Sequence, residues 1–273
     1  MRVSKDVARN EGANGLDMQS IVPVLETRGL TIRFGGHVAV NDVSCAFLPG
    51  SLTAIVGPNG AGKTTYFNLI SGQLRASAGQ VLVKGADVTR LPAAARTRRG
   101  LGRAFQLTNL FPNLTVFENV RLAVQARAGA GLNLWTLWTD RRDLISAAAA
   151  VLDRVRLSDK RDLIAGTLPH GDQRKLEVAL LISLEPDVFM FDEPTAGMSV
   201  EEVPNVLEII GELKRDAAKT ILLVEHKMDV VRSLAERIIV LHNGAVVADG
   251  PPGEVMASAI VREAYLGQEL GDD

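Results

Sequence analysis

One stretch constrains the fold of this chain more than any other: Gly57-Pro58-Asn59-Gly60-Ala61-Gly62-Lys63-Thr64-Thr65, directly after the apolar run Leu52–Val56. It fits G-x-x-x-x-G-K-[ST], in which glycines let successive backbone N–H groups converge on phosphate oxygens. Lys63 adds a mobile positive charge, and the Thr64 hydroxyl suits a Mg²⁺ that bridges the outer phosphates. A helix from Thr64 onward points its positive dipole end at the same anion. The loop therefore predicts a nucleoside triphosphate with Mg²⁺.

Two other interpretations of the loop fit less well. A plain connecting turn does not require so many constrained positions between a strand and a helix. A dinucleotide-binding turn would use Gly60 and Gly62, but Lys63 and Thr64 belong to a phosphate clamp. No acidic residue closes a second strand near position 80, where that fold would need one.

Bulk properties narrow the class of protein further. A chain of 273 residues with 47% apolar residues can form one large domain or a domain with a subdomain. The net charge of −2 argues against a nucleic-acid binder. A single cysteine, Cys45, suits a reducing compartment. Residues 1–20 lack an apolar centre, so we expect a disordered extension over 1–23 rather than a secretory signal.

Residues 24–56 are typical of strands separated by glycine turns at Gly35-Gly36 and Pro49-Gly50. Phe34 precedes the first of these turns. It could present its ring to a purine base, although core packing is the more common role of a strand aromatic, and the residue alone favours the core.

A basic cluster follows, comprising Arg96, Arg98, Arg99 and Arg103. Such a run usually forms a solvated face, which is what we expect here. Gln106 comes after the apolar strand 101–105, so its amide oxygen could reach an ion or a water molecule at a sheet edge.

The segment 114–163 differs in composition from what precedes it: it contains a glycine-rich break at 129–131 and an alanine-rich stretch at 146–152. It predicts helices inserted into an α/β body. Trp135 and Trp138 share a face if helical; packing within the subdomain and contact with a partner both stay open.

Two later apolar runs end in polar residues suited to chemistry. The run 188–191 leads into Asp192 and Glu193, and the run Thr220–Val224 leads into Glu225 and His226. Asp192 can hold Mg²⁺ together with Thr64, and Glu193 can orient or deprotonate a water molecule for attack on the terminal phosphate. The alternatives are two acids that cap a strand exit and a structural histidine. The histidines and Cys45 lack zinc-ligand spacing.

In this order, the phosphate loop, Gln106, a Leu-x-x-Gly helix start, the acidic pair and His226 resemble the ATP-binding subunit of ABC transporters over about 24–267. Residues 105–106, 109–119, 224–229 and 264–267 resemble more narrowly the ATPases of branched-chain amino acid importers. Those of urea and short-amide importers are close relatives.

The resemblance implies an α/β fold with a P-loop NTPase (RecA-like) core, an antiparallel β subdomain and an inserted α-helical subdomain. It implies an ABC ATPase domain over 24–267, in which 24–113 and 186–267 form the core with the β subdomain. The helical subdomain and signature would occupy about 114–185, and 268–273 would form a tail.

The resemblance also implies site roles. Phe34 would stack on adenine. Thr64, Gln106 and Asp192 would form the Mg²⁺ site, which Gln106 would also link to the helical subdomain. Glu193 would be the catalytic base, and His226 would sense the terminal phosphate. Residues 57–65 would hold ATP. The signature Leu168, Pro169, His170, Gly171 and Asp172 would complete the ATP site of a second subunit.

The implied partners are two transmembrane permease subunits, a second ATP-binding subunit and, indirectly, a solute-binding protein, with no nucleic acid. The implied location is the cytoplasmic face of the inner (plasma) membrane, as a peripheral subunit. Two positions depart from the family pattern: Pro169 replaces the usual serine, which removes a hydroxyl and an N–H, and Ser199 replaces a common aspartate. These departures suggest a heterodimer with unequal sites.

Two other classes share parts of this pattern. A soluble P-loop kinase would grip phosphate in the same way but should need neither Gln106, His226 nor a signature. A soluble ABC-type ATPase of DNA repair or translation is disfavoured by the near-neutral charge and by the lack of a long coiled-coil insertion or a tandem second ATPase half.

Overall fold

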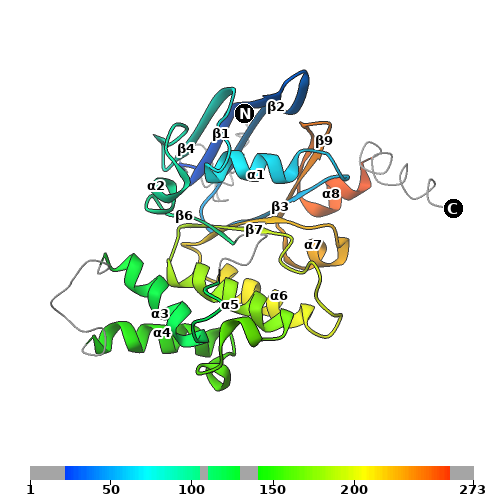
Figure 1. Ribbon diagram of the computed structural model, residues 1–273. Helices are drawn as coiled ribbons and strands as arrows, with labels where there is room; N and C mark the ends of the chain where they lie inside the picture. The colour runs from blue at the N-terminus through cyan, green and yellow to red at the C-terminus, as the bar shows by residue number, and fades with distance from the viewer. Residues whose placement is uncertain (1–21, 105–109, 130–140, 259–273) are drawn as a thin grey trace, which may run out of the picture.

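The computed structural model describes residues 22–104, 110–129 and 141–258 (Figure 1). Its centre is a six-stranded sheet of order β10-β9-β3-β8-β7-β6. The strands are β3 (Leu52–Val56), β6 (Leu101–Ala104), β7 (Val188–Asp192), β8 (Thr220–Val224), β9 (Arg237–His242) and β10 (Ala245–Gly250). All neighbours pair in parallel except β9 and β10. Parallel strands buried on both faces are expected to be continuously apolar, and β3, β7 and β8 are buried at every position.

The strand order brings three chain segments to one sheet edge. β8 lies between β3 and β7, where Val224 pairs with Ile55 on one side and with Asp192 on the other. The carboxyl ends of parallel strands share one edge, which is where ligands bind in sheets of this kind. The loops after β3, β7 and β8 therefore emerge next to one another.

A second, antiparallel sheet has the order β2-β1-β4-β5. Its strands are β1 (Leu25–Phe34), β2 (His37–Phe47), β4 (Ala78–Val83) and β5 (Ala86–Asp87). Helix α1 (Lys63–Ser71) runs between the two sheets (Figure 1). Its fully buried Tyr66, Phe67 and Ile70 belong to one apolar core that includes residues of both sheets. The helix that follows the phosphate loop is therefore anchored on two sides.

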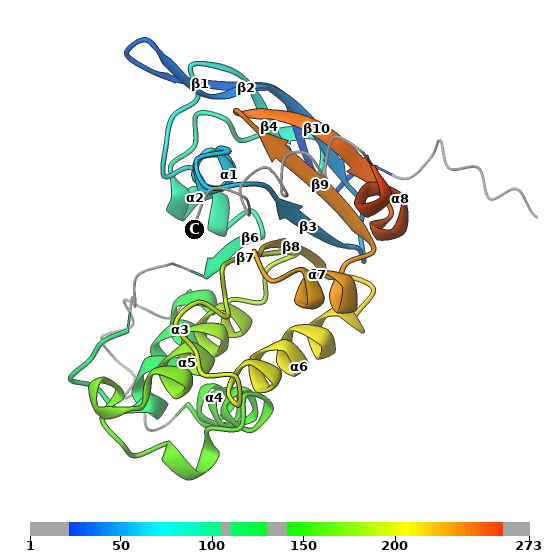
Figure 2. The ribbon, with the colours of Figure 1, turned by 90° about the vertical axis from the view of Figure 1, so that its right-hand side faces the viewer.

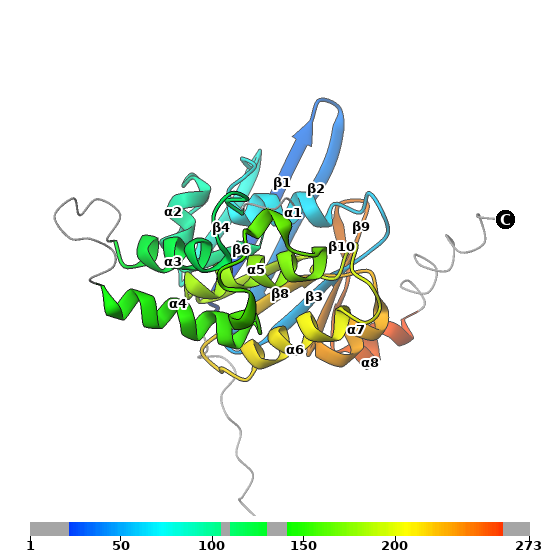
Figure 3. The same cartoon turned by 60° about the horizontal axis from the view of Figure 1, so that its bottom comes forward.

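The opposite face of the six-stranded sheet carries the larger helices (Figure 2). These are α3 (Val116–Arg127), α4 (Arg142–Arg154), α5 (His170–Ser183) and α6 (Val203–Lys214). Thr115 and Glu118 form a reciprocal capping box at the start of α3, as the sequence Thr-x-x-Glu favours. Figure 3 shows α3, α4 and α5 side by side. Shorter elements are α2 (Ala93–Thr97), α7 (Met228–Leu234), α8 (Pro252–Ala257) and 3₁₀ turns at Ser158–Lys160 and Ala165–Thr167.

The basic cluster is not the solvated face that the sequence suggested. Arg98 and Arg99 are exposed, but Arg96 is 2% exposed and Arg103 is 8% exposed. Arg96 donates to the carbonyls of Leu69 and Ile70 in the last turn of α1, and to two further carbonyls of the segment that leads into α2. A helix end leaves its last carbonyls unpaired, and a buried guanidinium with five donors satisfies them.

Some predictions fall on residues that the structure does not describe. These are most of the extension 1–23, Gln106, Trp135, Trp138 and the tail 268–273. Within the described ranges, no helix combines the length and apolar character required to cross a bilayer.

Candidate functional site

The phosphate loop needs glycine at two positions for steric reasons. Gly57 has φ +151° and Gly62 has φ +98°, and α1 begins immediately after Gly62. A Cβ on Gly57 would lie 2.1 Å from the carbonyl oxygen of Leu241, and one on Gly62 would lie 2.4 Å from that of Ala39. The loop is thus packed against backbone on two sides, with the start of a helix directed at its centre.

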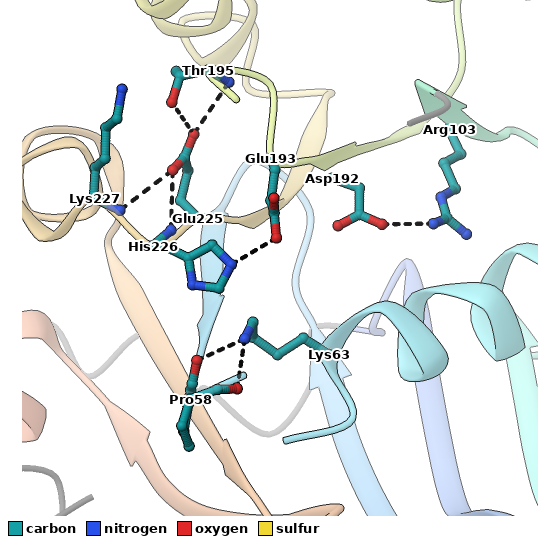
Figure 4. A network of polar contacts seen from close by, with 10 residues as sticks. Pro58, Lys63, Arg103, Asp192, Glu193, Thr195, Glu225, His226 and Lys227 are labelled. Atoms are coloured by element: carbon teal, nitrogen blue, oxygen red, sulfur yellow. Dashed lines mark hydrogen bonds and ion pairs between the residues drawn. The ribbon is translucent and has the colours of Figure 1, made fainter. Parts of the chain in front are cut away.

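Lys63 lies inside the curve of this loop. Its Nζ donates to the carbonyls of Gly57 at 2.6 Å and Pro58 at 2.9 Å (Figure 4). Burial lowers the pKa of this ammonium, while the negative charges of Glu193 and Asp192 act in the opposite direction. Because the ammonium is already largely out of bulk water, exchange of these two carbonyls for phosphate oxygens adds little desolvation of the lysine itself.

A cleft of about 340 Å³ opens over the loop. It is lined by Phe34, His37, Ala39, Asn59, Gly60, Ala61, Gly62, Lys63, Thr64, Thr65, Glu193 and His226. Phe34 is 50% exposed at the end of β1, so the core-packing interpretation of this ring is wrong. The structure thus brings an accessible aromatic ring, the phosphate loop and the polar ends of β7 and β8 into one cavity.

Glu193 and His226 face each other across the strand ends. Glu193 Oε1 lies 2.6 Å from His226 Nε2 (Figure 4). Glu193 has φ +50°, an uncommon left-handed conformation for this residue, and its N–H donates to the carbonyl of Val224 at 2.9 Å. Strain of this kind concentrates at functional sites. Both side chains are partly exposed and both line the cleft, so a bound molecule can reach them.

Asp192 is held differently from its neighbour. Its Oδ2 accepts a hydrogen bond from Arg103 Nη2 at 2.7 Å, and both side chains are almost completely buried. Burial raises the pKa of this carboxyl, and Arg103 counteracts the rise. Asp192 Oδ1 is buried without a hydrogen-bond partner among the described residues. Asp192 is not among the residues that line the Lys63 cleft, but it directly precedes Glu193, which does. Its unpaired carboxylate oxygen is of the kind that Mg²⁺ prefers as a ligand.

The residues that match the signature do not line this cleft. Leu168 is buried and Pro169 is exposed at the N-cap of α5. Asp172 accepts hydrogen bonds from Lys160 at 2.5 Å and Lys175 at 2.9 Å. Those bonds lower the pKa of its carboxyl even though burial acts in the opposite direction and is the larger single influence. Asp172 therefore stabilises the start of α5 and does not contribute to the Lys63 cleft.

The start of α5 lies beside the loop that follows β7. A Cβ on Gly171 would lie 2.2 Å from Glu202 Oε1, and a Cβ on Gly197 would lie 3.1 Å from His170 Nε2. Glycine at both positions allows this close approach.

Sequence reasoning assigned no role to four residues at or beside the site. His37 and Ala39 line the cleft. His37 pairs with Phe34 across the Gly35-Gly36 turn, and two strand-like runs on either side of this turn were a sequence signal for that pairing. Thr195 and Glu225 are buried next to Glu193 and His226 and are joined by a hydrogen bond of 2.6 Å. No spacing rule in the sequence predicts that pairing.

This arrangement can bind a polyanion and activate water. Lys63 and the loop N–H groups attract phosphates, the Thr64 hydroxyl and Asp192 suit a divalent cation, and Glu193 can accept a proton. The described residues contain no group of three or more His, Cys, Asp or Glu side chains placed to hold a metal by themselves.

Comparison with known proteins gives concordant results. A family model described as ABC transporter matches residues 40–196, and one described as branched-chain amino acid ATP-binding cassette transporter matches residues 245–270. The high-affinity branched-chain amino acid transport ATP-binding protein LivG of Escherichia coli (strain K12) is 36% identical over 251 residues, which cover 90% of this chain and 98% of that protein. The protein BraF of Pseudomonas aeruginosa, whose description is otherwise the same, matches at the same identity and coverage.

A solved structure has the same fold. The ADP conformation of an ATP-binding cassette from an ABC transporter superposes with a TM-score of 0.77 at 28% identity, over 89% of this chain and 98% of that one. The P-loop NTPase core and the mixed α/β architecture expected from the sequence are confirmed by this likeness.

Proposed function

The chain belongs to the ABC transporter family, and we propose that it is the ATP-binding and ATP-hydrolysing subunit that powers an importer of branched-chain amino acids. The cargo follows from the relatives, which carry that description, and from the family match at 245–270. An importer of urea or short amides is the alternative cargo assignment. A soluble ABC-type ATPase without a transport role is the less favoured one.

One observation carries the ATPase part of the proposal. Lys63, Glu193 and His226 arise from three different segments of the chain and line the same cleft. A P-loop kinase would use the lysine but has no need of the Glu193–His226 contact. We propose that Glu193 deprotonates the attacking water and that His226 contacts the terminal phosphate.

Residues 59–65 line the cleft and, together with Gly57 and Pro58, would hold the phosphates of ATP. The exposed ring of Phe34 would stack on the adenine. Thr64 and the free Oδ1 of Asp192 would bind Mg²⁺, which supplies charge neutralisation on the phosphates. Gln106 is retained as a proposed ligand from the sequence. The division into core, β subdomain, helical subdomain and tails is retained as well.

We propose a second ATP-binding subunit as a partner. The segment 168–172 lies outside the chain's own cleft, and Pro169 and His170 at its N-terminal end are exposed. Val200, in the adjacent loop, is 88% exposed. This surface is available to complete the ATP site of another chain. Because Pro169 provides neither a hydroxyl nor an N–H there, we propose a heterodimer with unequal sites.

We further propose that two transmembrane permeases dock on the chain, which would place it peripherally on the cytoplasmic face of the plasma membrane. A solute-binding protein would act indirectly, and nucleic acid would take no part. An exposed apolar surface supports the docking: Phe111, Leu163 and Ile164 are 56%, 49% and 41% exposed. Backbone hydrogen bonds from Val116 to Leu163 and from Gly166 to Pro112 join the two segments that carry them.

The test is reconstitution of the full transporter in vesicles, with measurement of ATP hydrolysis and solute uptake. We expect leucine, isoleucine or valine with the binding protein to stimulate both, and urea and acetamide to leave both at the basal level. Stimulation by an amide alone would assign the alternative cargo. Appearance of a phosphorylated small molecule in place of free phosphate would refute the transport ATPase.

A further inference from the structure

Glu225 is a buried carboxylate that none of the proposed roles uses. It directly follows β8, immediately before His226, and is 3% exposed. Glu225 takes part in none of the ion pairs found among the described residues. Burying a carboxylate without a cation is costly unless strong hydrogen bonds compensate it. The residue therefore needs a specific explanation.

The two oxygens of Glu225 are bound by two different loops (Figure 4). Oε1 accepts from the hydroxyl of Thr195 at 2.6 Å and from the N–H of Thr195 at 3.3 Å. Oε2 accepts from the N–H of His226 at 3.1 Å and, at the longer distance of 3.4 Å, from that of Lys227. One side chain thus joins the loop after β7 to the loop after β8.

These are the same two loops that carry Glu193 and His226. A contact of 2.6 Å between two partly exposed side chains tolerates little displacement of either backbone. The hydrogen bond from Glu193 N–H to the Val224 carbonyl also links these loops, and the Glu225 carboxylate adds a buried connection that uses neither the Glu193 nor the His226 side chain. Displacement of catalytic groups by an ångström can cost a hundredfold in rate.

We propose that Glu225 is a positioning residue that sets the geometry of the Glu193–His226 pair, with Thr195 as its partner. This inference rests on the proposed ATPase function. It assigns to Glu225 no contact with nucleotide: the residue acts through the backbone of its neighbours. Only a carboxylate offers acceptors to both loops at once, because an amide would turn an NH₂ donor toward one pair of donors.

The experiment uses the full chain in the assembled transporter. Glu225→Gln changes the acceptor with almost no change of volume, and Thr195→Val removes the hydroxyl from the other side. Thr220→Val is the matched control, because the Thr220 hydroxyl is also buried but lies at the opposite end of β8, where it donates to the carbonyl of Leu48. For each variant, kcat, KM, ATP affinity by equilibrium binding and Tm are measured.

We expect Glu225→Gln and Thr195→Val each to lower kcat by about tenfold or more, with ATP affinity and Tm close to those of Thr220→Val. Because both break the same connection, the double variant should be no slower than the slower single variant. Unchanged kcat in Thr195→Val and Glu225→Gln would overturn the proposal. So would a parallel loss of kcat, affinity and Tm, which indicates structural support alone, or a double variant whose losses multiply.

Glu193→Gln, included in the same series, distinguishes a failure of the proposed ATPase function from a failure of the positioning role of Glu225. If Glu193→Gln hydrolyses ATP at the full rate, the proposed function itself fails. If Glu193→Gln is inactive while both positioning variants turn over normally, only the role of Glu225 fails. Should Glu225→Gln not fold, the result for Thr195→Val decides.

Discussion

Arg103 Nη2 donates to Asp192 Oδ2 at 2.7 Å, and the two side chains are 5% and 0% exposed. The same guanidinium also donates to Asn68 and Ser71, which belong to α1, and it lies over the ring of Phe67 at 5.6 Å. One buried cation thus connects β6, the helix after the phosphate loop and the proposed Mg²⁺ ligand Asp192. Removal of this guanidinium should therefore lower the stability of the folded protein, whatever its effect on ATP hydrolysis.

Replacing Arg103 by Met should destabilise the protein by about 3–5 kcal/mol, because the Asp192 charge would stay buried without its partner. Denaturant unfolding followed by fluorescence would measure the change. Arg98→Met is the matched control, since Arg98 is exposed on the same segment. Equal stability of the two variants would contradict the inferred importance of the pair.

Glu193→Gln should retain ATP affinity and lose turnover by at least about a hundredfold, because an amide cannot accept the proton of the attacking water. Equilibrium ATP binding and phosphate release would be compared in the same preparation. Glu208→Gln, on the exposed face of α6, serves as the control. Undiminished phosphate release from Glu193→Gln would eliminate it as the base.

Phe34→Ala should weaken ATP binding by about 1–3 kcal/mol, the range measured when a ring that stacks on a base is removed. Phe34→Trp should restore most of the affinity, since a larger ring can stack as well. Calorimetric titration with ATP measures both. If the alanine and tryptophan variants bind alike, the ring does not stack on the base.

In the proposed heterodimer, Pro169→Ser should strengthen the proposed contact between residues 168–172 and the ATP of the second subunit by about 1.5–3 kcal/mol, the contribution of a hydrogen bond to a charged group. We expect higher ATP affinity or turnover of the assembled transporter at the site that this chain completes. A rate and an affinity both equal to those of the parent would count against unequal sites.

The pH dependence of stability should contain a contribution from Glu177 in α5. Burial raises the pKa of this carboxyl above its ordinary value of 4.5, although Arg174 acts in the opposite direction. The folded state then binds the proton more tightly than the unfolded state does, so the free energy of unfolding falls as pH rises from about 4.5 through the raised pKa. Glu177→Gln should flatten this fall in a Tm-against-pH series. Glu208→Gln, which removes a carboxylate at an exposed position, is the control for the loss of one negative charge.

The sequence predicted those parts of the site that depend on a fixed local pattern. The phosphate loop needs glycines where a Cβ would meet the backbone of Leu241 or Ala39, and the G-x-x-x-x-G-K-[ST] pattern records that need directly. Asp192 and His226 follow continuous apolar runs, which identify buried parallel strands and therefore their shared edge. Local pattern and sheet geometry were sufficient for these residues.

Other features depended on contacts between distant segments. Arg96 and Arg103 read as surface charges because no local rule distinguishes an arginine that caps a helix from a solvated one. Phe34 reads as a core residue because its exposure depends on where the β1–β2 hairpin ends relative to the phosphate loop. Glu225 and Thr195 are separated by thirty positions, and only the pairing of β7 with β8 brings them together.

Side chains alternate in direction along β8 and just beyond it, and this alternation decides which residue after the strand faces the cleft. Glu225 turns inward and is buried, while His226 turns outward and is 40% exposed. A slip of one residue in the pairing of β8 would exchange the two, so that the imidazole would enter the protein interior and the acid would face the nucleotide. Insertions of a single residue into β8 should thus abolish activity even where the fold survives. The register of β8 against β3 and β7 therefore determines which of the two side chains faces the cleft.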